Sequence, residues 1–206
     1  MPARWADPSA PSPVTYARGV AIIGVIACAA GGVEQLCDEL VTPLVDAGHQ
    51  VPVTLTPTAF TWLRANGDAD RIEALTGFPV RGPSRLPWEP RTHPAQLDAI
   101  VVAPATFNST AKIALGLADN QALTVVTESL TTVPVVLFPL INAAHADHPA
   151  WPSHMTALRA AGVDLIEGPD VWPLHPPRQM PPDQKLPWGA IVEATQRGLK
   201  TAGQRG

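Results

Sequence analysis

The chain of 206 residues contains little cysteine and little charge. Its two cysteines, Cys28 and Cys37, are nine residues apart, a spacing that matches neither a Cys-x-x-Cys motif nor a zinc site, so we expect reduced thiols in a cytoplasmic protein. Charged residues make up 16% of the chain, the net charge is −4, and the basic residues form no run. This composition argues against a surface for nucleic acid or for an anionic membrane. No histidine, cysteine and aspartate spacing indicates a metal site.

The sequence also lacks a hydrophobic run long enough to span a bilayer near its N-terminus. Arg18 precedes the apolar run 19–30, whose Ala-Cys-Ala-Ala end is similar to a signal-peptidase site. Cleavage there would remove the first strand of a βαβ unit, so we expect neither secretion nor a membrane segment. The Gly-x-Ser-x-Gly, Gly-x-x-x-x-Gly-Lys and Gly-x-Gly-x-x-Gly motifs are absent as well, which excludes the simplest hydrolase and nucleotide-binding readings.

What is present is an alternation of strand and helix patterns. Residues 1–18 are rich in proline, alanine and serine and are expected to form a flexible tail, whereas 19–206 are expected to form one domain. The alternation predicts an α/β three-layer sandwich around a parallel sheet. The expected strands are 20–27, 50–55, 98–103, 133–138 and 163–166, and the expected helices are 32–47, 57–65, 68–75, one from 108, one from 120, 151–161 and one from 188.

The most informative segment joins one of these strands to a helix. A β-branched run at 100–102 predicts a strand buried on both faces, which we expect Pro104 to end. Thr106, Asn108 and Ser109 then supply polar groups where the next helix begins. Because ligands bind at the carboxyl ends of parallel strands and helix N-termini favour anions, this segment indicates a phosphate or flavin site. An ordinary helix cap would have the same local features.

Three other strand ends carry comparable segments. Gly31-Gly32-Val33 follows the first strand, and its glycines allow the backbone to approach an anion. Thr56 to Ala59 follows the second strand, and Asn142 stands three residues after the proline that ends the strand expected at 133–138. Helix capping or a turn would account for each segment taken alone.

The order of these segments resembles the homo-oligomeric flavin-containing cysteine decarboxylases. The Pro-Ala-Thr-Phe-Asn-Ser run at 104–109, with Ala-Lys-Ile-Ala and Gly-Leu-Ala-Asp-Asn after it, is similar to the family's FMN-binding Pro-Ala-Ser-Ala-Asn-Thr motif, and the resemblance spans about residues 19–166. It implies a flavodoxin-like, Rossmann-like fold, with FMN bound between subunits of a homotrimer or of a homododecamer of trimers. The FMN-binding residues that it implies are Gly31, Gly32, Val33, Thr56, Ala59, Pro104, Ala105, Thr106, Asn108, Ser109, Lys112 and Asp119.

The same resemblance implies two catalytic residues. Asn142 matches the asparagine of the family's Pro-x-Met-Asn segment, which holds the substrate carboxylate, although Ile141 stands in place of the methionine. His93 is the histidine expected to act as base. It precedes Asp98 by five residues, which is closer than the family spacing.

The C-terminal third of the chain bears on the substrate. Phosphopantothenoylcysteine decarboxylases resemble this chain, but they use a flap cysteine as proton donor, and here no cysteine follows Cys37. The corresponding segment, 168–187, is a flap rich in proline that also contains a tryptophan. We therefore predict FMN-dependent oxidative decarboxylation of a C-terminal cysteine of a peptide to an enethiol, as in aminovinyl-cysteine formation. The alternatives are phosphopantothenoylcysteine decarboxylation, prenyl-flavin synthesis and flavin binding without decarboxylase activity.

Overall fold

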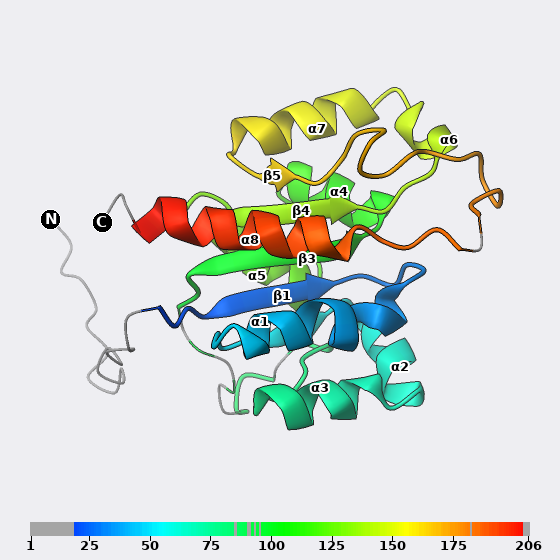
Figure 1. Cartoon of the computed structure of the whole chain (residues 1–206). Coiled ribbons are helices and arrows are strands. Elements are labelled where there is room, and N and C mark those ends of the chain that lie inside the picture. Colours follow the sequence, from blue (N-terminus) through cyan, green and yellow to red (C-terminus); the bar gives the residue numbers. More distant parts are fainter. Residues whose placement is uncertain are drawn as a thin grey trace, which may run out of the picture.

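The computed structural model describes residues 19–84, 86–89, 92, 94, 96–181 and 183–203. The expected tail 1–18 and the expected base His93 lie outside these residues. Five parallel strands form one sheet in the order β2-β1-β3-β4-β5, as expected for the predicted α/β fold (Figure 1). The strands are β1 (Ile23–Ala27), β2 (Val53–Leu55), β3 (Ala99–Ala105), β4 (Val135–Pro139) and β5 (Asp164–Leu165). The helices are η1 (Val33–Gln35), η2 (Cys37–Val41), α1 (Thr42–Asp46), α2 (Pro57–Ala65), α3 (Asp68–Thr76), α4 (Phe107–Ala114), α5 (Gln121–Ser129), α6 (Ala143–Ala146), α7 (Trp151–Ala160) and α8 (Trp188–Gly203).

Helices cover both faces of the sheet, which is why the strands are apolar throughout. On one face α1, α2, α3 and α8 pack on Val25, Val101 and Phe138, whereas on the other α4, α5 and α7 pack on Ile26 and Val102. Figure 1 shows α1 and α8 in front of the sheet and α4 and α5 behind it. All five strands run in the same direction, so their carboxyl ends lie along one edge, which we call the carboxyl edge. The helix boundaries at 57, 68, 151 and 188 are confirmed.

The prediction that Pro104 ends its strand is wrong, because β3 continues to Ala105. A proline cannot donate a hydrogen bond to a neighbouring strand, but it can still accept one. The carbonyl of Pro104 accepts from the N–H of Cys28 at 3.0 Å, and the carbonyl of Ala105 accepts from Leu140 at 2.8 Å. The strand does not end at Pro104, but its pairing with β4 shifts in register between Val102 and Ala105. The Ala103–Pro104 peptide bond, which is cis, lies within this stretch. Ala105 consequently packs on the opposite face from Ala103.

The helix predicted over 32–47 is confirmed as a helical segment over 33–46, but it is not a regular α-helix, because η1, the π-helical η2 and α1 follow one another along it. Pro43 lies in the first turn of α1 and has no N–H to donate to the preceding turn. At the junction, the Cys37 carbonyl accepts hydrogen bonds from the backbone N–H of Thr42 and, at 2.9 Å, from its hydroxyl. The hydrogen-bond pattern of an α-helix is therefore displaced by one residue at this point.

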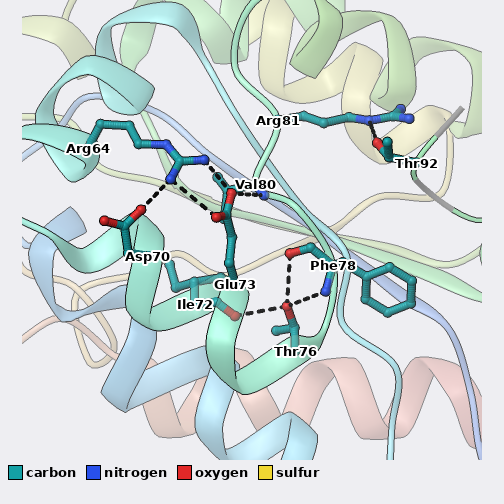
Figure 2. A network of polar contacts seen from close by, with 9 residues as sticks. All are labelled: Arg64, Asp70, Ile72, Glu73, Thr76, Phe78, Val80, Arg81 and Thr92. Atoms are coloured by element: carbon teal, nitrogen blue, oxygen red, sulfur yellow. Dashed lines mark hydrogen bonds and ion pairs between the residues drawn. The ribbon is translucent and has the colours of Figure 1, made fainter. Parts of the chain in front are cut away.

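A polar network fixes α2 and α3 against the outer edge of the sheet (Figure 2). Arg64 of α2 forms ion pairs with Asp70 and Glu73 of α3, and Glu73 also accepts from the N–H of Val80 at 2.8 Å. Burial disfavours the charged Glu73 side chain, but the hydrogen bonds from Arg64 and Val80 hold its pKa below the ordinary value. Arg81, one residue further on, exchanges backbone hydrogen bonds with β2. The network therefore connects the helix pair to the sheet.

Candidate functional site

Backbone hydrogen bonds bring the four predicted segments together at the carboxyl edge. The N–H of Thr56, after β2, donates to Ala27 of β1 at 3.0 Å. The residue after β1, Cys28, donates to Pro104, and the residue after β4, Leu140, donates to Ala105. Segments that are distant in sequence therefore line one side of the molecule, as the parallel arrangement requires.

The turn between β3 and α4 is held by hydroxyl groups. The Thr106 side chain caps α4 by accepting from the N–H of Ser109 at 3.2 Å, and the two hydroxyl oxygens are 3.1 Å apart. Ser109 is buried, and so is the thiol of Cys28. Burial raises the pKa of this thiol, and the hydrogen bonds from Ser109 and from the backbone of Thr106 oppose that effect. Asn108 is the exposed polar residue of the turn.

The turn after β1 is shaped by two glycines with different surroundings. Gly32 has a φ of 85°, and a Cβ at this position would lie 2.4 Å from Cδ1 of Leu186, so both its conformation and its packing require glycine. Gly31 is exposed and has open space where a Cβ would be. Val33 is buried in the core. A ligand at this turn would therefore meet the backbone of Gly31 first.

Two further predicted residues lie at the start of α2. Thr56 is the N-cap residue, and its side chain makes no capping hydrogen bond, so its hydroxyl remains free of that role. Ala59 is fully buried in the core and supports the helix rather than facing the edge.

Lys112 and Asp119, both expected to bind FMN, contact each other. They form an ion pair with each other, Lys112 from α4 and Asp119 from the segment before α5. Hydrogen bonds and charge from Lys112 lower the pKa of Asp119. Leu115 and Leu117, which lie between them in sequence, are exposed at 62% and 49%. Neither the ion pair nor these two leucines line the two cavities described below.

Asn142 is the N-cap residue of α6, a short helix that the sequence pattern did not predict. Its side-chain oxygen accepts from the N–H of His145 at 3.0 Å. His145 stacks on Phe107 with ring centroids 4.7 Å apart, and Trp151 stacks on the same ring at 5.3 Å. Phe107 therefore joins the β3–α4 turn to the segment that carries Asn142. In the sequence, the only feature that could have indicated this stacking is the aromatic residue among the small and polar residues at 104–109.

The segment 168–187 lies over the carboxyl ends of β4 and β5. Trp172 is 5% exposed and packs edge-on against Phe138 of β4, with ring centroids 5.5 Å apart. Trp172 and Ile141 line two neighbouring cavities, one of about 460 Å³ with mostly apolar walls and one of about 320 Å³ that also contains Asn142. This segment and the β4–α6 turn together enclose space for a ligand beside the strand ends.

A model of the Flavoprotein family matches residues 19–199. The bifunctional coenzyme A biosynthesis protein CoaBC of Bacillus subtilis is 33% identical over 148 residues, which are 69% of this chain and 35% of that protein. CoaBC of Thermococcus kodakarensis is 35% identical over 75 residues, which are 36% of this chain and 19% of that protein. The chain therefore matches about a third or less of the length of these relatives. None of the helices formed by the described residues combines the length and the hydrophobicity needed to span a bilayer.

Solved structures share the fold. The FMN-dependent cysteine decarboxylase TvaF of thioviridamide biosynthesis superimposes with a TM-score of 0.62 at 23% identity, covering 87% of this chain and 98% of TvaF. The cypemycin decarboxylase CypD gives 0.64 at 18% identity, covering 88% of this chain and 94% of CypD. A mutant PPC decarboxylase complexed with pantothenoylaminoethenethiol gives 0.55 at 18% identity, with 71% and 81% of the chains covered. The family expected from the sequence is confirmed: the chain belongs to the Flavoprotein family, whose fold it shares with FMN-dependent cysteine decarboxylases.

Proposed function

We propose that this protein is an FMN-dependent decarboxylase that oxidatively decarboxylates the C-terminal cysteine of a peptide. The observation that carries the proposal is the convergence of the Gly31, Thr56, Thr106 and Asn142 segments at one edge of the sheet. The family match and the cysteine decarboxylases among the structural neighbours support it.

The residues at this edge suit a flavin. Gly31 leaves backbone open to a phosphate, the hydroxyl of Thr56 is not used for capping, and Asn108 is exposed at the first turn of α4, where backbone N–H groups favour an anion. FMN bound there would supply the oxidising power that turns the carbon bearing the thiol into an electron sink for loss of carbon dioxide. Lys112 and Asp119 line neither cavity described above, so their contact with FMN stays a prediction from the family motif. The homotrimer or homododecamer is likewise a prediction, and light scattering of the purified protein measures the assembly directly.

The chain's own contribution is to bind and orient the substrate. The Asn142 side chain, half-buried beside the 320 Å³ cavity, would orient the substrate carboxylate by hydrogen bonds. An amide N–H can donate a hydrogen bond to a carboxylate oxygen, which fixes the orientation of the carboxylate. His93 stays the proposed base for the thiol proton.

Phosphopantothenoylcysteine decarboxylation is the second candidate, since the CoaBC relatives support it at the level of sequence. The two reactions differ in their products. Oxidative decarboxylation removes carbon dioxide and two hydrogen atoms, whereas the coenzyme A pathway reaction removes carbon dioxide alone. We would incubate the FMN-loaded protein with a cysteine-terminated peptide and, separately, with 4′-phosphopantothenoylcysteine, and measure product masses. Loss of carbon dioxide plus two hydrogens from the peptide is the expected result. Turnover of the phosphorylated substrate alone would favour the second candidate, and turnover of neither would leave flavin binding without decarboxylase activity.

A further inference from the structure

The 320 Å³ cavity at the carboxyl edge has polar side chains on two opposing segments. Asn142 is the N-cap of α6 and His145 lies within α6, whereas His175 and Arg178 come from the 168–187 segment. Among the described residues that line this cavity there is no aspartate or glutamate. The side chains that face it therefore offer hydrogen-bond donors and positive charge, which suits an anion.

His175 is held close to Asn142 by the backbone. The N–H of Ala143, the residue after Asn142, donates to the carbonyl of His175 at 2.9 Å. The Nε2 atom of His175 is buried and has no hydrogen-bond partner among the described residues. Buried polar atoms are nearly always paired, so an unpaired one on a residue that lines a cavity points to a partner gained when a ligand binds.

Arg178 has a backbone conformation that its residue type does not favour. The N–H of Gln179 donates to the carbonyl of Pro176 at 3.1 Å, which closes a four-residue turn. Arg178 is the third residue of this turn, with a φ of 65°, and Pro177 is the second. That pattern is typical of a type II turn, whose third position favours glycine or asparagine. Arginine at this position, on the wall of a cavity, suggests a side chain retained for what it binds.

We propose that Arg178 and His175 join Asn142 in binding the α-carboxylate of the substrate's C-terminal cysteine. The proline-rich segment is then a carboxylate-recognition element that takes the place of the family's cysteine-bearing flap. This inference rests on the proposed function, because it assumes a substrate with a terminal cysteine. Arginine binds carboxylates through paired N–H groups, and Arg178 is an exposed residue of the cavity lining.

The chemistry predicts how Arg178 acts on the reaction. The carboxylate loses its negative charge as carbon dioxide leaves, so an arginine bonded to it stabilises the bound substrate at least as well as the transition state. Removal of Arg178 is therefore expected to raise KM about tenfold with kcat within about twofold of the original protein. A residue that merely supported the fold would not produce this division between KM and kcat.

The direct test measures binding without turnover. The FMN-loaded protein is titrated by calorimetry with a peptide that ends in serine, which has a hydroxyl in place of the thiol, as the free carboxylate and as the amide. We expect the carboxylate to bind at least about tenfold more tightly than the amide, which is a difference of about 1.4 kcal/mol. Arg178→Gly, which relaxes the turn, and His175→Ala should both reduce this preference. Met180→Ala, at another residue of the cavity wall, should preserve it.

Equal binding of carboxylate and amide by the original protein would overturn the inference, as would an unchanged preference in Arg178→Gly. Phosphopantetheine, which has a phosphate and no carboxylate, tests the other source of negative charge. If Arg178→Gly weakens the binding of phosphopantetheine but not the binding of the peptide with a free carboxylate, then Arg178 does not bind the substrate carboxylate. Failure of the proposed function is recognised separately, since the protein would then lack FMN or turn over no cysteine-terminated substrate.

Discussion

The backbone N–H of Ala143 donates a hydrogen bond to the carbonyl of His175 at 2.9 Å. This contact fastens the proline-rich segment 168–187 to the turn that begins with Asn142. The buried packing of Trp172 on Phe138 attaches the same segment to β4. The two walls of the 320 Å³ cavity are therefore fixed relative to each other, which favours a precise fit to a small charged group.

Asn142 has two roles that substitutions can separate. An aspartate at this position would cap α6 as well as asparagine does, so Asn142→Asp should change the free energy of unfolding by less than about 0.5 kcal/mol. The negative charge of the new side chain would repel the substrate carboxylate, and we expect kcat/KM to fall at least about 100-fold. Thermal unfolding and the rate of carbon dioxide release measure the two effects. Unchanged turnover in the Asn142→Asp variant would remove Asn142 from carboxylate binding.

The two glycines after β1 should respond differently to alanine. Gly32→Ala places a Cβ against Leu186 at a positive φ, and we expect a loss of about 2 to 4 kcal/mol in the free energy of unfolding. Gly31→Ala meets open space and should change stability by less than about 0.5 kcal/mol, while weakening FMN binding because the methyl group lies at the exposed turn. Denaturant unfolding and FMN titration of both variants provide the comparison. Equal stability of the two would contradict the packing described for Gly32.

The lowered pKa of Glu73 should make the free energy of unfolding depend on pH. Its pKa in the folded protein is lowered, so its contribution is complete above the unfolded pKa of about 4.3 and is lost as the pH falls through the folded value. Glu73→Gln should cost about 0.5 to 1 kcal/mol at pH 7, and the two proteins should converge at pH values below the folded pKa. Asp70→Asn is the matched control, because Asp70 contacts the same Arg64 but is 71% exposed. A stability difference that persists undiminished in acid would show that the charge of Glu73 is not its cause.

Cys28 should be an unreactive thiol in the folded protein. It is 1% exposed, and burial raises its pKa, so little thiolate is available to an alkylating reagent. In a Cys37→Ala background, iodoacetamide at pH 8 should modify Cys28 at least about 100-fold more slowly than in denaturant, as followed by mass spectrometry. Complete labelling of Cys28 under native conditions, with an unchanged circular dichroism spectrum, would show that the thiol is not buried in the folded protein.

Much of the fold was predictable from local patterns. The carboxyl ends of the first four strands could be assigned to one edge, because parallel strands joined by helices must align these ends. The exact residue at which β3 ends could not be predicted, because whether Pro104 stays in the sheet depends on Cys28 and Leu140, which are distant in sequence. The irregular hydrogen bonding in the helical segment 33–46 could have been inferred from Pro43, which removes a backbone donor.

The site was predicted less completely than the fold. Motif similarity located Thr106 and Asn142, but stacking of Phe107 on His145 depends on packing between α4 and α6, and no local pattern specifies it. A turn at 176–179 was recognisable in principle from the Pro-Pro-Arg-Gln sequence, but its type II form was not, because arginine does not favour a positive φ at the third position. His93 lies outside the described residues, so its role as base stays a prediction.

FMN binding is the central claim, and the absorption spectrum of the purified protein tests it most directly. We expect a yellow protein whose cofactor, released by denaturation, has the mass of FMN, and an apoprotein that recovers one FMN for each chain. A colourless protein that takes up no added FMN would contradict the account, because the residues gathered at the carboxyl edge would then serve some other ligand.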